Sequence, residues 1–215
     1  MTDSRTGLLI DWGGVLTTNL FGSFAAFCEA EGIAPTAVRD AFLGNPQART
    51  LLADFECGRI GEAAFEPGFA ALLGLREHEG LIQRLFGGMQ ADQAMLHAVA
   101  AFKRAGVRTG LLSNSWGADT YDRSRFDELF DVLVISGEEG VRKPEPAIYA
   151  LAAERMGLPP EALVFVDDIP GNLKPARAIG MATVHHVDAA QTIDALEELL
   201  GVSARPAPGG GAPRR

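Results

Sequence analysis

Five polar side chains, each placed after a short apolar run, have the types needed to handle a phosphate group. They are Asp11, Ser113, Lys143, Asp167 and Asp168. The apolar runs are typical of buried parallel strands and cover residues 8–10, 107–112, 132–135 and 163–166. Because the carboxyl ends of parallel strands converge on one crevice, we expect the five side chains to meet there.

Three of these side chains are carboxylates, which would resist ionising together if they lay close to one another. A divalent cation, with the ammonium group of Lys143, would neutralise them. The sequence therefore predicts a site that holds both a cation and a phosphate group.

The spacing of apolar residues predicts an α/β fold, a doubly wound parallel sheet with helices on both faces. A first strand at residues 7–11 is followed by four short stretches with helical spacing, broken by glycines, at residues 21–30, 35–43, 62–73 and 81–86. Strands and helices then alternate. The helices are expected at residues 92–105, 120–130, 146–156, 170–179 and 190–200, and the strands at residues 107–112, 132–135, 163–166 and 182–187.

This order predicts a core domain with a small helical insertion. We place the core at residues 1–18 and 91–201, and the insertion at residues 19–90. The tail, residues 202–215, is rich in Pro, Gly and Arg, so we expect it to be disordered.

The composition excludes several classes of protein. The formal net charge of -9 argues against a nucleic-acid partner, which would need a basic face. No apolar run approaches the roughly 18 residues of a membrane span, and no signal peptide is recognisable. We therefore expect a cytoplasmic protein without a membrane partner, either a monomer or a homodimer. Cys28 and Cys57 show no metal-ligand spacing and are expected to be buried free thiols.

Four segments together resemble the haloacid dehalogenase-like hydrolases, in the subfamily whose small helical cap follows the first strand. These segments are residues 9–16, 111–114, 140–145 and 164–168. The last of them continues to residue 181 and is similar to the N-terminal phosphatase domain of soluble epoxide hydrolases, while residues 56–60 resemble a turn of the cap. Each motif alone is weak, but four in the right order and context are specific.

The resemblance implies a role for each of the polar residues. Asp11 would attack phosphorus and form an aspartyl-phosphate that water hydrolyses. Ser113, the backbone N–H of Asn114 and Lys143 would hold the phosphoryl oxygens, with Lys143 also neutralising Asp11. Trp12 and Gly13, beside the nucleophile, would also contact the phosphate.

A Mg²⁺ ion is the cofactor that the resemblance implies. Its ligands would be Asp11, the carbonyl of Gly13 and Asp168, together with water and phosphate. Asp167 would bind the ion directly, bind it through water, or pair with Lys143, and the sequence leaves these possibilities open. Asn172 would orient Lys143 or a carboxylate, although an exposed amide fits the pattern nearly as well.

Gly13 departs from the pattern of the family's phosphatases. These usually carry a second aspartate there, two residues after the nucleophile, which protonates the leaving oxygen and then activates water. Loss of such a group typically costs about 10²–10⁴ in rate. A good leaving group, a cap residue or metal-bound water would have to compensate, or the enzyme would be slow.

Other functions are compatible with parts of the pattern. Dehalogenases of the family also lack the second aspartate, but they use no metal and carry no adjacent aspartate pair. Phosphonoacetaldehyde hydrolases have a similar start but need a cap lysine, and this chain has no lysine before Lys103. A receiver domain places its acidic pair after the first strand, the reverse of the order here. A weakly catalytic regulatory protein that keeps the phosphate and metal pocket remains an alternative.

The sequence favours a Mg²⁺-dependent phosphatase of a small phosphorylated metabolite, acting through Asp11. In the insertion, the candidates for contacting the leaving group are Arg49, Phe55, Glu56 and Arg59, because cap loops close over such a crevice. The alternative interpretation is that these are ordinary surface residues of a small helical domain.

Overall fold

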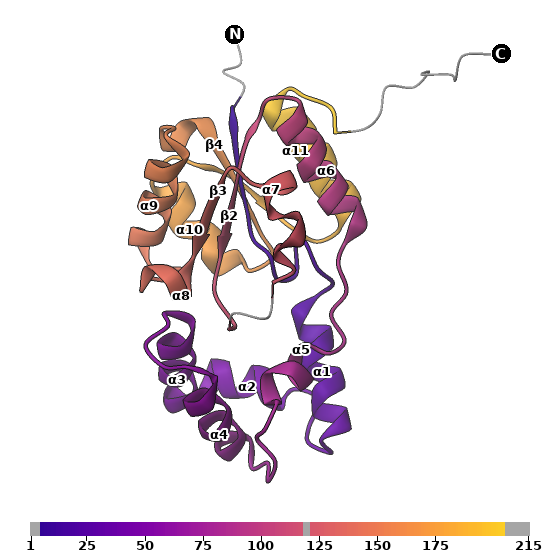
Figure 1. Cartoon of the computed structure of the whole chain (residues 1–215), viewed down its shortest axis with the longest axis vertical. Helices are drawn as coiled ribbons and strands as arrows, with labels where there is room; N and C mark the ends of the chain where they lie inside the picture. Colours follow the sequence, from indigo (N-terminus) through magenta and orange to yellow (C-terminus); the bar gives the residue numbers. More distant parts are fainter. Residues whose placement is uncertain (1–4, 118–120, 205–215) are drawn as a thin grey trace, which may run out of the picture.

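The computed structural model describes residues 5–117 and 121–204 and contains one five-stranded parallel sheet (Figure 1). The strands are β1 (Gly7–Ile10), β2 (Arg108–Ser113), β3 (Val132–Ile135), β4 (Leu163–Asp167) and β5 (Ala182–His185). Their spatial order is β3-β2-β1-β4-β5. The predicted α/β class with a parallel sheet is therefore confirmed.

Strand β1 lies in the middle of the sheet and is buried on both faces. Its last residue, Ile10, is opposite Leu111 of β2 and Val166 of β4. Leu8 and Ile10 pack into one hydrophobic cluster, and Leu9 packs into the other. Burial on both faces explains why these strands are continuous apolar runs. It also brings the residues that follow β1, β2 and β4 to one edge of the sheet.

Helices cover both faces of the sheet (Figure 1). One layer contains α6 (Gln93–Arg104), α7 (Phe126–Leu129) and α11 (Ala189–Leu200). The other contains α9 (Pro146–Met156) and α10 (Pro170–Ala178), and the short helix α8 (Ser136–Glu139) directly follows β3. In α6 and α11, a preceding aspartate side chain fixes where the helix begins. Asp92 accepts the N–H of Met95, and Asp188 accepts the N–H of Gln191.

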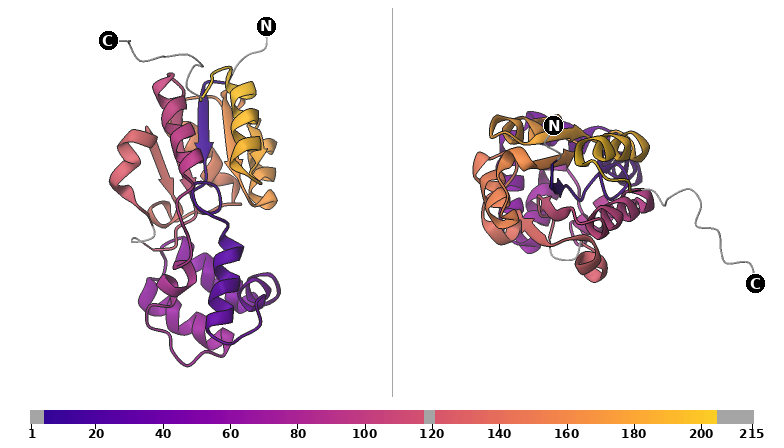
Figure 2. Two further views of the ribbon diagram at one scale, coloured as in Figure 1. Left: turned by 90° about the vertical axis from the view of Figure 1, so that its right-hand side faces the viewer. Right: turned by 90° about the horizontal axis from the view of Figure 1, so that it is seen from above.

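Five further helices form a separate helical insertion between β1 and α6 (Figure 2). They are α1 (Leu20–Ala30), α2 (Ala37–Gly44), α3 (Pro46–Glu56), α4 (Glu62–Leu73) and α5 (Leu81–Phe86). Their apolar faces pack into a hydrophobic cluster distinct from those of the sheet. The two connecting segments pair through Thr17 and Ala91, beside the domain boundaries predicted from the sequence.

Beyond shifts of a residue or so at the ends of elements, the structure differs from the prediction in several places. Helix α3 was not predicted, although Asn45 and Pro46 are a recognisable start: the Asn45 side chain accepts the N–H groups of Gln47 and Ala48. The helix predicted at 120–130 is a 3₁₀ turn, Arg123–Arg125, followed by the four residues of α7. Residue 120 lies outside the described residues. Strand β5 ends at His185 rather than at residue 187.

The predicted disordered tail begins too early. Val202 and Ala204 pack against a core cluster, and the N–H of Ala204 donates to Glu197 at 2.8 Å. Residues 205–215 of the predicted tail lie outside the described residues. Both cysteines are buried free thiols, as predicted. Along the described part of the chain, no helix combines the length and apolar character that crossing a membrane requires.

Candidate active site

Asp11 directly follows β1 and is held by its own loop. The backbone N–H of Trp12 donates to Asp11 Oδ1 at 2.7 Å, and only 7% of Asp11 is exposed. Gly14 has φ +76°, and a Cβ there would lie 2.3 Å from Asp168 Oδ2. A side chain at position 14 would be strained by the backbone conformation and would also displace the Asp168 carboxylate.

Lys143 joins two of the carboxylates. Its Nζ lies 2.9 Å from Asp11 Oδ2 and 2.7 Å from Asp167 Oδ2, and the lysine is 1% exposed. Burial alone would lower the pKa of Lys143, but the carboxylates of Asp11 and Asp167 outweigh burial and raise it. The lysine is therefore a fixed positive charge at the centre of the site.

Asp167 and Asp168 have different surroundings although they are adjacent. Asp167 is fully buried and accepts hydrogen bonds from the N–H of Ile169 at 2.8 Å and from Asn172 Nδ2 at 3.0 and 3.1 Å, in addition to Lys143. By contrast, Asp168 Oδ1 is buried without a hydrogen-bond partner among the described residues. Asp167 is therefore satisfied by protein donors, whereas Asp168 has a free oxygen.

The acidic cluster carries surplus negative charge. Oxygens of Asp11, Asp167 and Asp168 lie within 4.8 Å of one another. Burial, with the charge of Asp167, raises the pKa of Asp168 to about 6. Burial also raises the pKa of Asp11, to about 8, against the opposing charge of Lys143 and with the charges of Asp167 and Asp168 adding to the rise. With all three carboxylates ionised, one ammonium would leave two negative charges, which a divalent cation such as Mg²⁺ would neutralise, and hard oxygen ligands of this kind suit such an ion.

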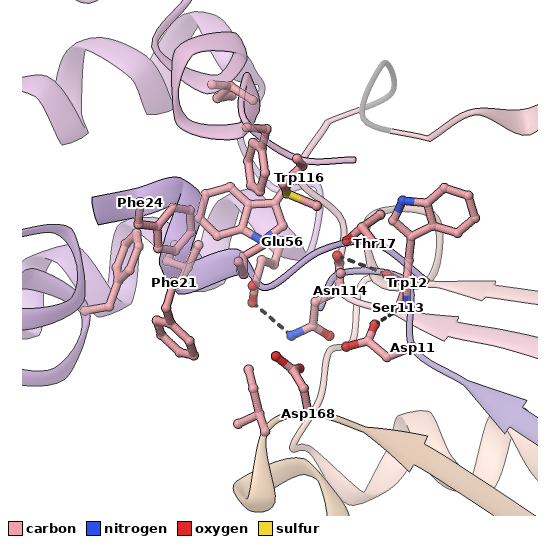
Figure 3. A pocket seen from close by; sticks show the side chains of 18 of the residues that line it. Asp11, Trp12, Thr17, Phe21, Phe24, Glu56, Ser113, Asn114, Trp116 and Asp168 are labelled. Carbon is pink, nitrogen blue, oxygen red and sulfur yellow. Dashed lines mark hydrogen bonds between the residues drawn. The ribbon is translucent and has the colours of Figure 1, made fainter. Parts of the chain in front are cut away.

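Ser113 and Asn114 lie at the end of β2. The hydroxyl of Tyr121 donates to Ser113 Oγ at 3.0 Å, and Ser113 is 2% exposed. The Asn114 side chain makes three hydrogen bonds. Its Oδ1 accepts the N–H of Lys143 at 2.9 Å, and its Nδ2 donates to the Lys143 carbonyl at 3.0 Å. Nδ2 also donates to Glu56 Oε2 at 3.1 Å (Figure 3). Asn114 thus connects the lysine segment to the helical insertion.

Glu56, the last residue of α3, reaches from the insertion into this network. Its Oε2 lies 2.5 Å from Nε of Arg142, and the residue is 4% exposed. Burial raises the pKa of Glu56 to about 7, although Arg142 and Lys143 oppose the shift. The backbone carbonyl of Glu56 accepts a hydrogen bond from Ser136, so the end of α3 is fixed to α8 as well.

A cavity of about 1010 Å³ lies between the sheet and the helical insertion. Asp11, Ser113, Asn114, Lys143 and Asp168 line it on the side of the sheet. Trp12 and Gly13 line it as well, and Asn172 contributes to the wall while bonding Asp167. The cavity therefore opens directly onto the predicted nucleophile.

The sequence matches a family model for haloacid dehalogenase-like hydrolases over residues 6–180. The chain belongs to this family. Rat bifunctional epoxide hydrolase 2 is 36% identical over 124 residues, which cover 54% of this chain and 22% of that protein. The hydrolase therefore spans about a fifth of that relative's length. Sesquiterpene phosphatase astK from Aspergillus oryzae is 26% identical over 198 residues, covering 90% of this chain and 95% of astK.

Solved structures share the fold of this hydrolase. A HAD family enzyme from Bacteroides thetaiotaomicron, in complex with magnesium and inorganic phosphate, superposes with a TM-score of 0.62 and 22% identity. The superposition covers 84% of this chain and 93% of the Bacteroides chain. At this identity the likeness concerns the fold, which agrees with the parallel sheet described above.

Only some of the insertion residues predicted to contact the leaving group line the cavity. Glu56 and Arg49 line the cavity, although Nη1 of Arg49 donates to the carbonyl of Leu43 at 2.7 Å. Arg59 is not among the residues that line the cavity; its side chain is 52% exposed and pairs with Asp54 at 2.7 Å. Phe55 is 4% exposed and stacks on Phe65 with ring centroids 4.3 Å apart, so it belongs to the hydrophobic core of the insertion.

Sequence reasoning missed three residues at the site. Trp116 and Tyr121 come from the segment after β2, where no periodic pattern indicates which way a side chain points. Arg142, beside Lys143, pairs with Glu56 across the two domains, and that partner cannot be found from local sequence. The proximity of Trp116 to Ser113, three residues away, was the one available signal.

Proposed function

We propose that this hydrolase is a Mg²⁺-dependent phosphatase that forms an aspartyl-phosphate on Asp11. The observation that carries the proposal is the arrangement of Asp11 between a buried lysine and the carboxylate of Asp168, whose buried Oδ1 has no partner among the described residues. The relative named a sesquiterpene phosphatase and the Bacteroides structure with magnesium and phosphate support it. The substrate would be a small phosphorylated metabolite.

Asp11 would act as the nucleophile. Its Oδ1 is fixed by the N–H of Trp12 and its Oδ2 by Lys143, whose positive charge favours the ionised carboxylate. One carboxylate oxygen bonds to phosphorus while the bond from phosphorus to the alcohol oxygen breaks. Water then attacks phosphorus, which releases inorganic phosphate and restores Asp11.

Ser113 and the backbone N–H of Asn114 would hold the phosphoryl oxygens. The Tyr121 hydroxyl donates to Ser113 Oγ, and the Ser113 hydroxyl itself donates to the Asn114 carbonyl over a long 3.4 Å. The Ser113 proton would turn from this weak bond to a phosphoryl oxygen. The side chain of Asn114 is occupied by Lys143 and Glu56, so its role is to position the lysine segment. Donors that are fixed before the reaction stabilise developing charge without reorganising.

Asp11, Asp168 and the carbonyl of Gly13 would hold Mg²⁺, which, when bound, neutralises charge on the phosphoryl group. Asp168 fits this role because its buried Oδ1 has no donor among the described residues. Asp167 would instead hold Lys143 in place, since both of its oxygens already accept hydrogen bonds. Asn172 would fix the orientation of Asp167.

The helical insertion, residues 19–90, would act as a cap that excludes water from the cavity. Gly13 has no acidic group that could protonate the leaving oxygen. The leaving group must therefore either depart without a proton or take one from water in the cavity. We therefore expect aryl phosphates to be turned over faster than alkyl phosphates of equal size.

Hydrolysis of p-nitrophenyl phosphate, with Mg²⁺ and then with excess EDTA, tests the proposal. We expect turnover that is lost on chelation and also lost in Asp11→Asn, a nearly isosteric change that removes the nucleophile. Metal-independent release of halide from a 2-haloacid would instead show a dehalogenase. Binding of Mg²⁺ and phosphate without turnover of any phosphate ester would show a regulatory protein, which the glycine at position 13 makes the second candidate.

A further inference from the structure

The cavity of this hydrolase has two unlike ends. The end at the sheet carries the charged and hydroxyl groups of the proposed phosphate site, including Asp11, Ser113 and Lys143. The far wall is apolar and largely aromatic, formed by Phe21, Phe24, Phe42, Leu52, Phe86 and Trp116. Figure 3 shows Phe21, Phe24 and Trp116 on one side of Glu56 and Asn114, with Asp11 on the other. A phosphate bound at the polar end would direct its ester group toward this wall.

Trp116 makes the wall continuous across the two domains. Although it follows β2 in the sheet domain, its ring lies 5.0 Å from that of Phe86 and 6.0 Å from that of Phe24, between ring centroids. Phe42 is 5.9 Å from the same ring. Edge-to-face packing with Phe86 and Phe42, and tilted packing with Phe24, make a rigid apolar surface. The wall is therefore preformed by contacts between side chains of the protein itself.

Three charged side chains on the insertion side of the cavity already form bonds within the protein. Glu66 accepts the N–H groups of Gly80 at 3.1 Å and Ile82 at 3.0 Å. Arg39 pairs with Asp40 at 3.1 Å, and Arg49 donates to the Leu43 carbonyl. A ligand rich in hydroxyl groups would lose its hydrogen bonds to water on entering the cavity and would gain few hydrogen bonds to the protein in return. Its binding would therefore be unfavourable.

Exposed apolar side chains also gather at this cavity. Among the described residues, four large hydrophobic side chains are exposed: Phe21 (45%), Leu43 (71%), Ile169 (39%) and Val187 (69%). The first three line the cavity, and Val187 does not. Apolar groups that stay exposed together, rather than singly, mark a surface that a ligand covers.

We propose that the leaving group of the natural substrate is a large apolar alcohol, alkyl or aryl, rather than a sugar or a nucleoside. This inference rests on the proposed function for the reaction, and on the cavity for the class of alcohol. The ester enters with its phosphate at Asp11 and its hydrocarbon against the aromatic wall. On hydrolysis the phosphorus to oxygen bond breaks, the alcohol oxygen takes a proton from water, and the apolar alcohol and phosphate leave.

A series of n-alkyl phosphates, from butyl to decyl, tests the inference below their micellar concentrations. Leaving-group chemistry is constant along this series, so kcat/KM reports on the cavity alone. We expect a rise of up to roughly fourfold for each added CH₂ until the cavity is filled. Octyl phosphate should exceed glucose 6-phosphate and adenosine 5′-monophosphate by at least tenfold. A flat series, or faster turnover of the sugar or nucleoside ester, would overturn the inference.

Two matched variants locate the effect. Leu43→Ser and Val187→Ser remove apolar side chains of nearly equal exposure, 71% and 69%, but only Leu43 lines the cavity. We expect Leu43→Ser to flatten the dependence of kcat/KM on chain length and Val187→Ser to leave the whole series unchanged. Equal effects of the two variants would contradict a contact between the alkyl chain and Leu43 on the apolar side of the cavity.

Binding to Asp11→Asn separates this inference from the proposed function. Calorimetric titration of that variant with the same alkyl phosphates, with Mg²⁺ present, should show a Kd that falls as the chain lengthens. If the wild type hydrolyses no phosphate ester but this dependence holds, the proposed reaction fails and the apolar ligand class stands. If aryl phosphate is hydrolysed but Kd and kcat/KM ignore chain length, the reaction stands and the inference fails.

Discussion

The side chain of Asn114 binds both backbone polar groups of Lys143, accepting from its N–H at 2.9 Å and donating to its carbonyl at 3.0 Å. This pairing fixes the segment from which the lysine reaches Asp11 and Asp167. The amide also donates to Glu56 of the helical insertion, so one side chain links the proposed catalytic lysine to the second domain.

Asn114→Asp should destabilise the protein and slow it. The change keeps the shape but replaces the amide donor by an oxygen that faces the Lys143 carbonyl and the Glu56 carboxylate. Leaving such buried acceptors unpaired costs about 1–3 kcal/mol. Asn45→Asp is the matched control, because Asn45 only accepts hydrogen bonds, at the start of α3. Urea unfolding and kcat measure both effects, and equal stability of the two variants would contradict the proposed role.

Asp167→Asn and Asp168→Asn should have opposite effects on stability in EDTA. Asp167→Asn weakens a buried pair with Lys143, so we expect a loss of about 3 kcal/mol. Asp168→Asn removes a carboxylate whose pKa is raised by burial, so the metal-free protein should become more stable.

In wild type, Mg²⁺ at 100 times its Kd should add about 2.7 kcal/mol to the free energy of unfolding, and Asp168→Asn should abolish this gain. Thermal unfolding with and without Mg²⁺ provides the measurement, and a retained Mg²⁺ effect in Asp168→Asn would remove it from the ligand set.

Gly13→Asp should speed turnover of alkyl phosphates more than that of aryl phosphates. The backbone at Gly13 does not have positive φ, and a Cβ there would meet only Leu20 Cδ1, at an ordinary 3.5 Å. An acid at this position could protonate a poor leaving oxygen, a contribution of about 10²-fold or more.

Gly13→Asn is the control for this prediction, since it has the same shape without the acid. Rates for octyl and p-nitrophenyl phosphates, with Mg²⁺ affinity measured alongside, distinguish the outcomes. Should neither rate rise while Mg²⁺ affinity is unchanged, protonation of the leaving group does not limit this enzyme.

Glu56→Gln should change the pH dependence of stability. Burial raises the pKa of Glu56 from 4.5 to about 7, so the folded state holds this proton more tightly than the unfolded chain does. The resulting stabilisation is complete below about pH 4.5 and is lost as the pH rises through 7. The free energy of unfolding of wild type, minus that of Glu56→Gln, should therefore fall by roughly 3 kcal/mol between these limits.

Urea unfolding in EDTA between pH 5 and 8 covers most of that window, and the other carboxylates cancel in the difference. Glu128→Gln is the control: Arg125 lowers the pKa of this exposed residue, so its titration lies below the window. A difference that stays flat for Glu56→Gln would show that Glu56 is ionised throughout, paired with Arg142.

The residues at the strand ends were predictable because the strands are. Asp11, Ser113 and Asp168 follow runs buried on both faces, and the parallel order brings those ends together without further information. The different surroundings of Asp167 and Asp168 were not predictable. They depend on Lys143 and Asn172, which approach from other segments.

The aromatic wall of the cavity could not be predicted from sequence patterns. Phe24 and Phe42 have helical spacing, which indicates a buried face but not what that face adjoins. Arg59 and Glu56 are only three residues apart, yet one pairs at the surface with Asp54 and the other is buried against Arg142. Their separation follows from the way α3 ends against α8, a tertiary contact with no local signature.

The chain contains two tryptophans, and both line the cavity between the domains. Trp12 adjoins the proposed nucleophile and packs against Phe126, while Trp116 contacts the aromatic rings of the insertion. Indole emission of the unmodified protein therefore originates entirely from this region. With selective excitation of tryptophan, the intrinsic fluorescence reports on this cavity alone. Movement of the insertion away from the sheet, or entry of a ligand, can therefore be followed in real time without a label.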